Sequence, residues 1–192
     1  MHVEYTAAQA ALRSEFRAYL AGLMSPEERK QLSHNREGGE LYRTVIRRMG
    51  EAGWLTPGWP VEYGGRALDP LAQKILLEEL WLAETPFPFV TVNTIGPALI
   101  RRGTAEQKRE FLPRIARGEI TFAVGYTEPT AGSDLASLKT RAERDGDHFI
   151  INGQKIFTSG AQSADYVWLA ARTDPNAPPH KGITLFVMDT RL

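Results

Sequence analysis

Apolar residues in the first part of the chain recur at intervals of three and four positions, which is the spacing of a helix with one buried face. Within Thr6–Met24 the recurring positions are Leu12, Phe16, Tyr19, Leu20 and Leu23. The same spacing predicts helices around residues 41–49, 71–80 and 94–102. This part of the chain is therefore expected to be helical, with a loop rich in glycine and proline over residues 56–65.

Capping residues mark where two further helices begin. Ser25 is followed by Pro26 and Glu28, which gives an N-cap, a proline in the first helical position and a capping-box carboxylate. Residues 104–107 offer a second capping box, and the helix that they open is expected to end at Gly118.

From Ile120 onward the apolar pattern changes to a period of two, which predicts strands. The predicted strands cover residues 120–124, 139–143, 148–157, 166–171 and 183–188, and Asp145-Gly146 predicts a hairpin between the second and third. Helices followed by strands indicate an α+β chain, with an all-α domain over residues 1–118 and a β-domain over residues 119–192. The last predicted strand runs almost to the final residue, which suggests that the sequence is cut short.

Composition excludes several functions. Lys plus Arg and Asp plus Glu both number 23, so there is no net charge to attract nucleic acid or a membrane surface. The absence of cysteine excludes disulfides and thiol catalysis, and the four histidines lack metal-ligand spacing, so no metal is expected. Neither a signal peptide nor an apolar run of membrane-spanning length is visible, so we expect a cytoplasmic protein. Rossmann, P-loop and serine-hydrolase motifs are also missing.

Two segments carry candidate binding chemistry, and the first is Gly125–Ser137. Its turn residues leave backbone N–H groups free, and its small side chains let a flat or anionic ligand come close. Thr127 and Ser133 add hydroxyl donors suited to a carbonyl or pyrophosphate oxygen. Taken alone, however, an ordinary strand-to-loop transition with Ser133 and Asp134 capping a turn is the simpler explanation.

The second segment, Asn152–Ala161, places an aromatic ring, two hydroxyl residues and a glycine at the end of a predicted strand. The ring of Phe157 could flank a planar heterocycle, and the hydroxyl groups could bond its edge. A core phenylalanine at a strand end is the simpler explanation when this segment is taken alone.

Together the two segments resemble the paired flavin motifs of acyl-CoA dehydrogenases. The residues that carry the resemblance are Thr127-Glu128-x-x-Ala131-Gly132-Ser133-Asp134 and Asn152-Gly153-x-Lys155-x-Phe157-Thr158-Ser159. The loop at residues 58–65 and the stretch 111–119 resemble parts of the family's helical domain, so the resemblance covers essentially the whole chain. It implies an FAD cofactor, a β-barrel-like middle domain, and a second, C-terminal helical bundle that this sequence does not contain.

The resemblance also implies roles for individual residues. One set is implied to hold the pyrimidine edge and the pyrophosphate of FAD: Tyr126, Thr127, Gly132 and Ser133. A second set is implied to line the isoalloxazine ring: Phe157, Thr158 and Ser159. Ser133 is also implied to contact the acyl-CoA substrate. Position 126 is usually aliphatic and position 157 usually Trp in the family, so ring stacking and redox tuning are expected to differ.

The family's catalytic base is a glutamate of the second helical domain, which is expected beyond Leu192. Glu128 and Asp134 are therefore expected to stabilise turns through backbone hydrogen bonds rather than to remove a proton.

The activity implied is α,β-dehydrogenation of an acyl-CoA thioester to the trans-2-enoyl-CoA, with electrons passed to an electron-transfer flavoprotein. A narrower likeness, carried by residues 42–50, 125–129, 134–138 and 172–177, is to actinobacterial enzymes of steroid side-chain β-oxidation. In that subgroup two unlike chains form an α2β2 tetramer, so we expect a homo- or heterotetramer. Two alternatives remain: a non-catalytic flavin- or CoA-binding partner subunit of the same fold, and a flavin monooxygenase of this fold.

Overall fold

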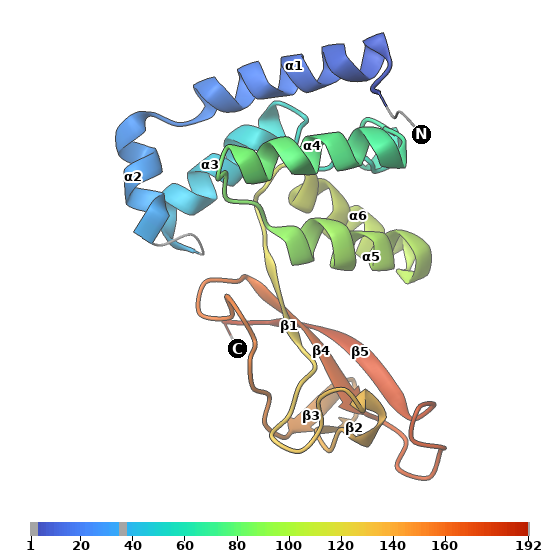
Figure 1. The fold of residues 1–192 in the computed structure, drawn as a ribbon. Coiled ribbons are helices and arrows are strands. Elements are labelled where there is room, and N and C mark those ends of the chain that lie inside the picture. Colours follow the sequence, from blue (N-terminus) through green and yellow to red (C-terminus); the bar gives the residue numbers. More distant parts are fainter. Residues whose placement is uncertain (1–3, 35–37, 192) are drawn as a thin grey trace. The chain divides into compact units, whose positions relative to one another are not determined.

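The computed structural model describes residues 4–34 and 38–191, and the chain divides into two compact units (Figure 1). The first, Met1–Ile120, is called the helical unit, and the second, Thr121–Leu192, is called the β unit. The predicted fold class is confirmed, because an all-α unit is followed by a unit built on a sheet.

The helical unit contains the predicted helices. The α-helices are α1 (Ala7–Leu23), α2 (Pro26–His34), α3 (Gly39–Glu51), α4 (Pro70–Leu82), α5 (Gly96–Arg102) and α6 (Ala105–Ala116). A short 3₁₀ helix, η1 (Val61–Tyr63), and a π-helical turn, η2 (Thr91–Ile95), complete it. The helix predicted over residues 94–102 therefore begins at Gly96, after this wider π turn.

The predicted capping residues act as N-caps. Ser25 and Glu28 bond reciprocally, with the Ser25 N–H donating to the Glu28 carboxylate over 2.8 Å and the Glu28 N–H donating to the Ser25 hydroxyl over 3.1 Å. Thr104 and Gln107 form the second capping box, as predicted. Each box pairs N–H groups that the first turn of a helix leaves without backbone partners.

The core of the helical unit gathers the apolar stripes of its helices. Phe16 of α1 is fully buried and packs against Trp54, with ring centroids 4.9 Å apart. The other buried members of the cluster are Leu20, Leu23, Met24, Leu32, Val45, Ile46, Met49, Leu55, Leu76, Leu80 and Val92. Burial of these side chains at about 1.5–3 kcal/mol each is the main force that holds the helices together.

Ion pairs around one buried carboxylate also join α1 to α4. Glu79 of α4 is only 2% exposed, and its carboxylate accepts hydrogen bonds from Arg13 Nε over 2.5 Å and from Arg17 Nε over 2.7 Å. The hydrogen bond from Arg17 is the main cause that lowers the pKa of Glu79, which falls to about 2 although burial opposes the shift.

The β unit is a mixed five-stranded sheet (Figure 1). Its strands are β1 (Phe122–Gly125), β2 (Arg141–Asp145), β3 (His148–Asn152), β4 (Tyr166–Arg172) and β5 (Ile183–Asp189), with a 3₁₀ turn, η3 (Leu135–Ser137), before β2. The central strand β4 pairs with β1 and β2 in parallel and with β5 antiparallel, while β3 pairs antiparallel with β2.

The predicted hairpin is present, with its boundaries shifted. Asp145 still belongs to β2 and pairs with His148, so the loop consists of Gly146 and Asp147. Gly146 has φ of 59°, a left-handed conformation that glycine adopts without steric cost.

The strand predicted over residues 148–157 is too long, because β3 ends at Asn152. Beyond it the chain turns Lys155 inward to bond Glu128, and Phe157 adopts a left-handed backbone, so neither continues a ladder. The strand predicted to begin at Lys139 begins two residues later in the structure, for a related reason. The N–H groups of Lys139 and Thr140 donate to the Glu128 carboxylate, and β2 begins only at Arg141.

Candidate functional site

The two segments singled out in the sequence lie side by side at the end of β1. The Ile156 N–H donates to the Thr127 carbonyl over 2.9 Å, and Lys155 Nζ donates to the Tyr126 carbonyl over 3.1 Å. The residues just before Phe157 are therefore fixed against the residues that follow β1.

Glu128 lies at the centre of this junction and is only 5% exposed. Its carboxylate accepts hydrogen bonds from the backbone N–H groups of Lys139 (2.6 Å) and Thr140 (2.8 Å) and from Lys155 Nζ (2.8 Å). Burial alone would raise the pKa of Glu128, but the hydrogen bonds from Lys155, Thr140 and Lys139 outweigh it and lower the pKa to about 2. The expectation that Glu128 stabilises a turn through backbone hydrogen bonds is confirmed.

The role of Lys155 was missed by sequence reasoning, although a signal was present. In a strand, residues at alternate positions share a face, so the predicted strand put Lys155 on the same face as Ile151 and Phe157. A lysine on an apolar face needs a buried partner of opposite charge. Glu128 is that partner, and the sequence alone did not reveal it.

Phe157 is the most unusual residue of the junction. The residue is 85% exposed, and its backbone has φ of 56°, a conformation that costs a non-glycine residue roughly 1–3 kcal/mol. The simpler explanation offered by the sequence, a core phenylalanine at a strand end, is therefore wrong. An exposed ring on a strained backbone offers a flat apolar face that a planar ligand would cover.

Tyr126 sits on the other side of the junction and is half-buried. Its phenol oxygen accepts a hydrogen bond from Trp168 Nε1 over 3.0 Å. Its ring packs against the small cluster formed by Ala131, Leu138 and Ala170. Tyr126 is thus anchored in the β unit at both its ring and its hydroxyl group.

Gly132 and Ser133 lie on the exposed turn that follows Glu128. Reciprocal backbone hydrogen bonds between Glu128 and Ala131 close the start of this turn. The N–H groups of Gly132 and Ser133 donate to no residue that the structure describes, and a Cβ added at Gly132 would meet nothing within 4 Å. N–H groups on an exposed turn that make no hydrogen bond within the described residues suit an anionic or carbonyl oxygen.

The remaining predicted site residues follow Phe157. Thr158 is half-buried and Ser159 is exposed, and the Ser159 N–H donates to the Phe157 carbonyl over 3.0 Å. The structure thus brings residues 157–159 next to Tyr126 and Thr127. Within the described residues, no hydrogen bond joins residues 157–159 to Gly132 or Ser133.

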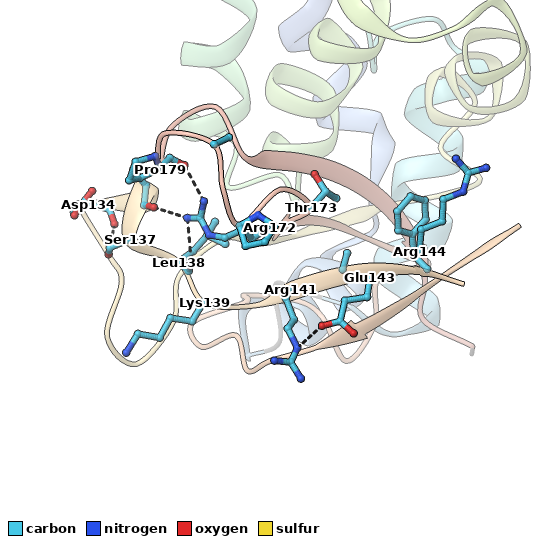
Figure 2. Close-up of a pocket in the computed structure, with 15 residues that line it drawn as sticks. Asp134, Ser137, Leu138, Lys139, Arg141, Glu143, Arg144, Arg172, Thr173 and Pro179 are labelled. Carbon is cyan, nitrogen blue, oxygen red and sulfur yellow. Dashed lines mark hydrogen bonds and ion pairs between the residues drawn. The ribbon is translucent and has the colours of Figure 1, made fainter. Parts of the chain in front are cut away.

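A hollow of about 1150 Å³ opens directly after Ser133, between the turn at residues 134–139, the start of the β2–β3 hairpin and the loop after β4 (Figure 2). Four basic side chains line it: Lys139, Arg141, Arg144 and Arg172. Its acidic lining residues are Asp134 and Glu143, and Glu143 is paired with Arg141 over 3.0 Å. The lining therefore carries an excess of positive charge, which suits a polyanion.

Arg172 orders the walls of this hollow. Its Nη2 donates to the carbonyls of Ala136 (2.7 Å) and Leu138 (3.2 Å), and its Nη1 donates to the Pro179 carbonyl (3.1 Å). Figure 2 shows the guanidinium set between the two loops that these carbonyls belong to. Sequence reasoning missed the hollow because its basic residues are distant in the sequence. Lys139 and Arg172, for example, are 33 positions apart.

Across the part of the chain that the structure describes, no helix is both long enough and apolar enough to cross a membrane.

Both parts of the chain, the helical one and the one built on a mixed sheet, match domains of a single protein family. Residues 6–119 match the acyl-CoA dehydrogenase N-terminal domain, and residues 123–192 match the acyl-CoA dehydrogenase middle domain. The chain belongs to the acyl-CoA dehydrogenase family.

Relatives within the family include two proteins of Mycobacterium tuberculosis. Acyl-CoA dehydrogenase FadE29 is 52% identical over 191 residues, which are 100% of this chain and 49% of that protein. Acyl-CoA dehydrogenase FadE26 is 49% identical over 196 residues, covering 99% of this chain and 49% of that protein. The chain thus spans about half the length of the curated relatives that it matches.

Two solved structures are also similar to this chain. The Tcur3481-Tcur3483 steroid ACAD matches with a TM-score of 0.92 and 53% identity, over 100% of this chain and 50% of that chain. The ChsE4-ChsE5 complex from Mycobacterium tuberculosis matches with a TM-score of 0.92 and 49% identity, over 99% of this chain and 48% of that chain.

Proposed function

We propose that the full-length protein is an FAD-dependent acyl-CoA dehydrogenase of the cytoplasm that acts on the CoA thioester of a steroid side chain. The observation that carries the proposal is the junction at the end of β1, where Phe157 lies exposed beside Thr127. The steroid ACAD among the similar structures supports the substrate class.

The residues of the junction fit a flavin. Phe157 offers a face for the isoalloxazine ring, and Thr158 and Ser159 supply hydroxyl groups at its edge. The free N–H groups of Gly132 and Ser133 suit the pyrophosphate, while Tyr126 and Thr127 form the wall for the pyrimidine edge. When bound, FAD supplies the acceptor for the hydride that leaves the β-carbon of the substrate.

The basic hollow fits the substrate's carrier. Coenzyme A brings several phosphate groups, and arginine and lysine side chains bind phosphate through charge-assisted hydrogen bonds. Ser133 precedes Asp134, which lines the hollow, and this neighbourhood supports a contact of the Ser133 hydroxyl group with the acyl-CoA as well as with the cofactor.

The α-proton requires a base that residues 1–192 do not provide. The pKa of Glu128 is about 2 and its carboxylate is occupied by three donors, so it is a poor acceptor for a weakly acidic proton. We place the base in the remainder of the full-length protein. Its action together with hydride loss leaves a trans-2-enoyl-CoA, and an electron-transfer flavoprotein is the proposed electron acceptor.

The proposed assembly is an α2β2 tetramer of unlike chains. The support is that similar structures are described by paired names, Tcur3481-Tcur3483 and ChsE4-ChsE5. The same observation favours one second candidate, a partner subunit of this fold that does not itself catalyse.

One experiment separates the two candidates. The full-length gene is co-expressed with any adjacent dehydrogenase-like gene, and FAD per chain and turnover of a steroid side-chain CoA thioester are measured. Bound FAD in this chain with turnover supports the dehydrogenase. A complex that turns over while this chain holds no FAD supports the non-catalytic subunit. Absence of FAD and of turnover in every assembly contradicts both.

A further inference from the structure

We propose that Glu128 and Lys155 are positioning residues, whose buried ion pair sets the place of Phe157, Thr158 and Ser159 against a bound flavin. The inference rests on the proposed function, because it concerns the same cofactor. It assigns a role to two buried residues that would not touch the cofactor themselves.

The pair is buried at both ends. The side chain of Lys155 is 10% exposed and that of Glu128 is 4% exposed, and Nζ lies 2.8 Å from Oε1. Lys155 also donates to the Tyr126 carbonyl over 3.1 Å, so one ammonium group holds two points of the segment after β1. A charge-assisted hydrogen bond in this setting is stronger and more directional than one at the surface.

Glu128 carries the constraint further, to β2. Its carboxylate accepts from the N–H groups of Lys139 and Thr140, the residues that lead into that strand. The segment after β3 passes close to the same place, since a Cβ added at Gly153 would lie 2.6 Å from the Thr140 Cα. Three stretches of backbone are therefore fixed around one carboxylate.

The position of Phe157 depends on this anchorage because its own ring is exposed and fixes nothing. The anchors nearest before it are the Lys155 ammonium group and the hydrogen bond from the Ile156 N–H to the Thr127 carbonyl. After Phe157, the hydrogen bonds from the Ser159 N–H to the Phe157 carbonyl and from the Ala161 N–H to the Thr158 carbonyl are local to the turn. The strained φ of 56° is thus held from the side of Lys155.

The test uses the full-length protein with FAD and compares Lys155→Met, Glu128→Gln and the double variant Glu128→Gln/Lys155→Met. The matched control is Arg191→Met, which removes an exposed ion pair with Asp189 in the same unit. The readouts are the Kd for FAD, the midpoint potential of the bound flavin, and folding by circular dichroism. A role limited to stability would move the unfolding transition and leave the potential of folded protein unchanged.

Both single variants are expected to raise the Kd for FAD about 10-fold or more and to shift the flavin potential. The double variant is expected to lose about as much as either single variant, because the two residues act as one unit. Lys155→Arg, which keeps the charge, is expected to retain more affinity than Lys155→Met. Arg191→Met is expected to match the wild type in both flavin readouts.

The double variant decides the outcome if a single variant does not fold, since it leaves no unpaired buried charge. Wild-type Kd and potential in the folded double variant would overturn the positioning role. A wild-type protein that cannot bind FAD would overturn the proposed function instead, so the two failures are distinguishable.

Discussion

The helical unit and the β unit each bury one glutamate whose pKa is about 2, but the partners of the two carboxylates differ. Glu79 accepts from the side chains of Arg13 and Arg17, both on α1, and so joins two regular helices. Glu128 accepts from two backbone N–H groups and from Lys155, and so fixes irregular chain beside the candidate site. A buried carboxylate therefore joins two helices in one unit, and in the other it fixes the backbone next to the residues that we propose to face the flavin.

The largest loss of stability is expected at acidic pH, because protonation removes the charge of both carboxylates. Each folded-state pKa lies below the ordinary value of 4.5, so each contribution to stability is complete above pH 4.5 and is lost as the pH falls toward 2. The loss amounts to about 3 kcal/mol for each carboxylate. Urea unfolding from pH 6 to pH 2.5, followed by circular dichroism, measures it. Stability that does not fall over this range would contradict both assignments.

Glu79→Leu tests the role of the buried carboxylate in the helical unit. It removes the acceptor of two partly exposed arginines and is expected to cost about 2 kcal/mol of stability, while the Kd of the full-length protein for FAD stays unchanged. The control is Glu78→Gln, whose partly exposed carboxylate is expected to contribute less than about 1 kcal/mol. Loss of FAD binding by folded Glu79→Leu would erase the distinction between the two units.

Phe157→Ala tests the exposed ring of the β unit. The ring is exposed, so its removal is expected to cost little stability, yet it is expected to raise the Kd for FAD about 10-fold through lost stacking. Leu185→Ala, which removes another exposed apolar side chain of the same unit, is the control and is expected to leave the Kd unchanged. Equal Kd values for the two variants would mean that Phe157 does not face the flavin.

The smallest effect is expected from Ser159→Val. One lost hydrogen bond at the flavin edge is worth about 0.5–1.5 kcal/mol, which appears as a weaker Kd or a shifted flavin potential. Ser163→Val is the control, because the Ser163 hydroxyl donates within its own turn to the Gly160 carbonyl over 3.2 Å. Identical flavin behaviour of the two variants would contradict the placement of Ser159.

Local patterns in the sequence were enough to predict most of the fold. The capping residues Ser25 and Thr104 and the apolar stripe of α1 depend on neighbours a few positions away, and all three were predicted correctly. The π turn at Thr91–Ile95 was not, because a wider helical turn leaves no distinct spacing of apolar residues.

The candidate site was predictable in its residue types but not in its geometry. Phe157 had the pattern of a strand residue, but β3 ends at Asn152, and beyond it Lys155 pairs with Glu128, 27 positions away in the sequence. The basic hollow also depends on distant contacts, since Lys139 and Arg172 come to line it through the pairing of β2 with β4 and through the hydrogen bonds from Arg172 to the turn before β2. Contacts between distant positions are decided by the tertiary fold rather than by local propensity.

The most direct test of the account is the amount of FAD that the full-length protein retains. Wild-type protein and Lys155→Met are purified side by side, checked for folding by circular dichroism, and compared by visible flavin absorbance per chain. We expect bound FAD in the wild type and markedly less in the folded variant. A colourless wild type that cannot be reconstituted with FAD, or a folded variant with undiminished FAD, would contradict it.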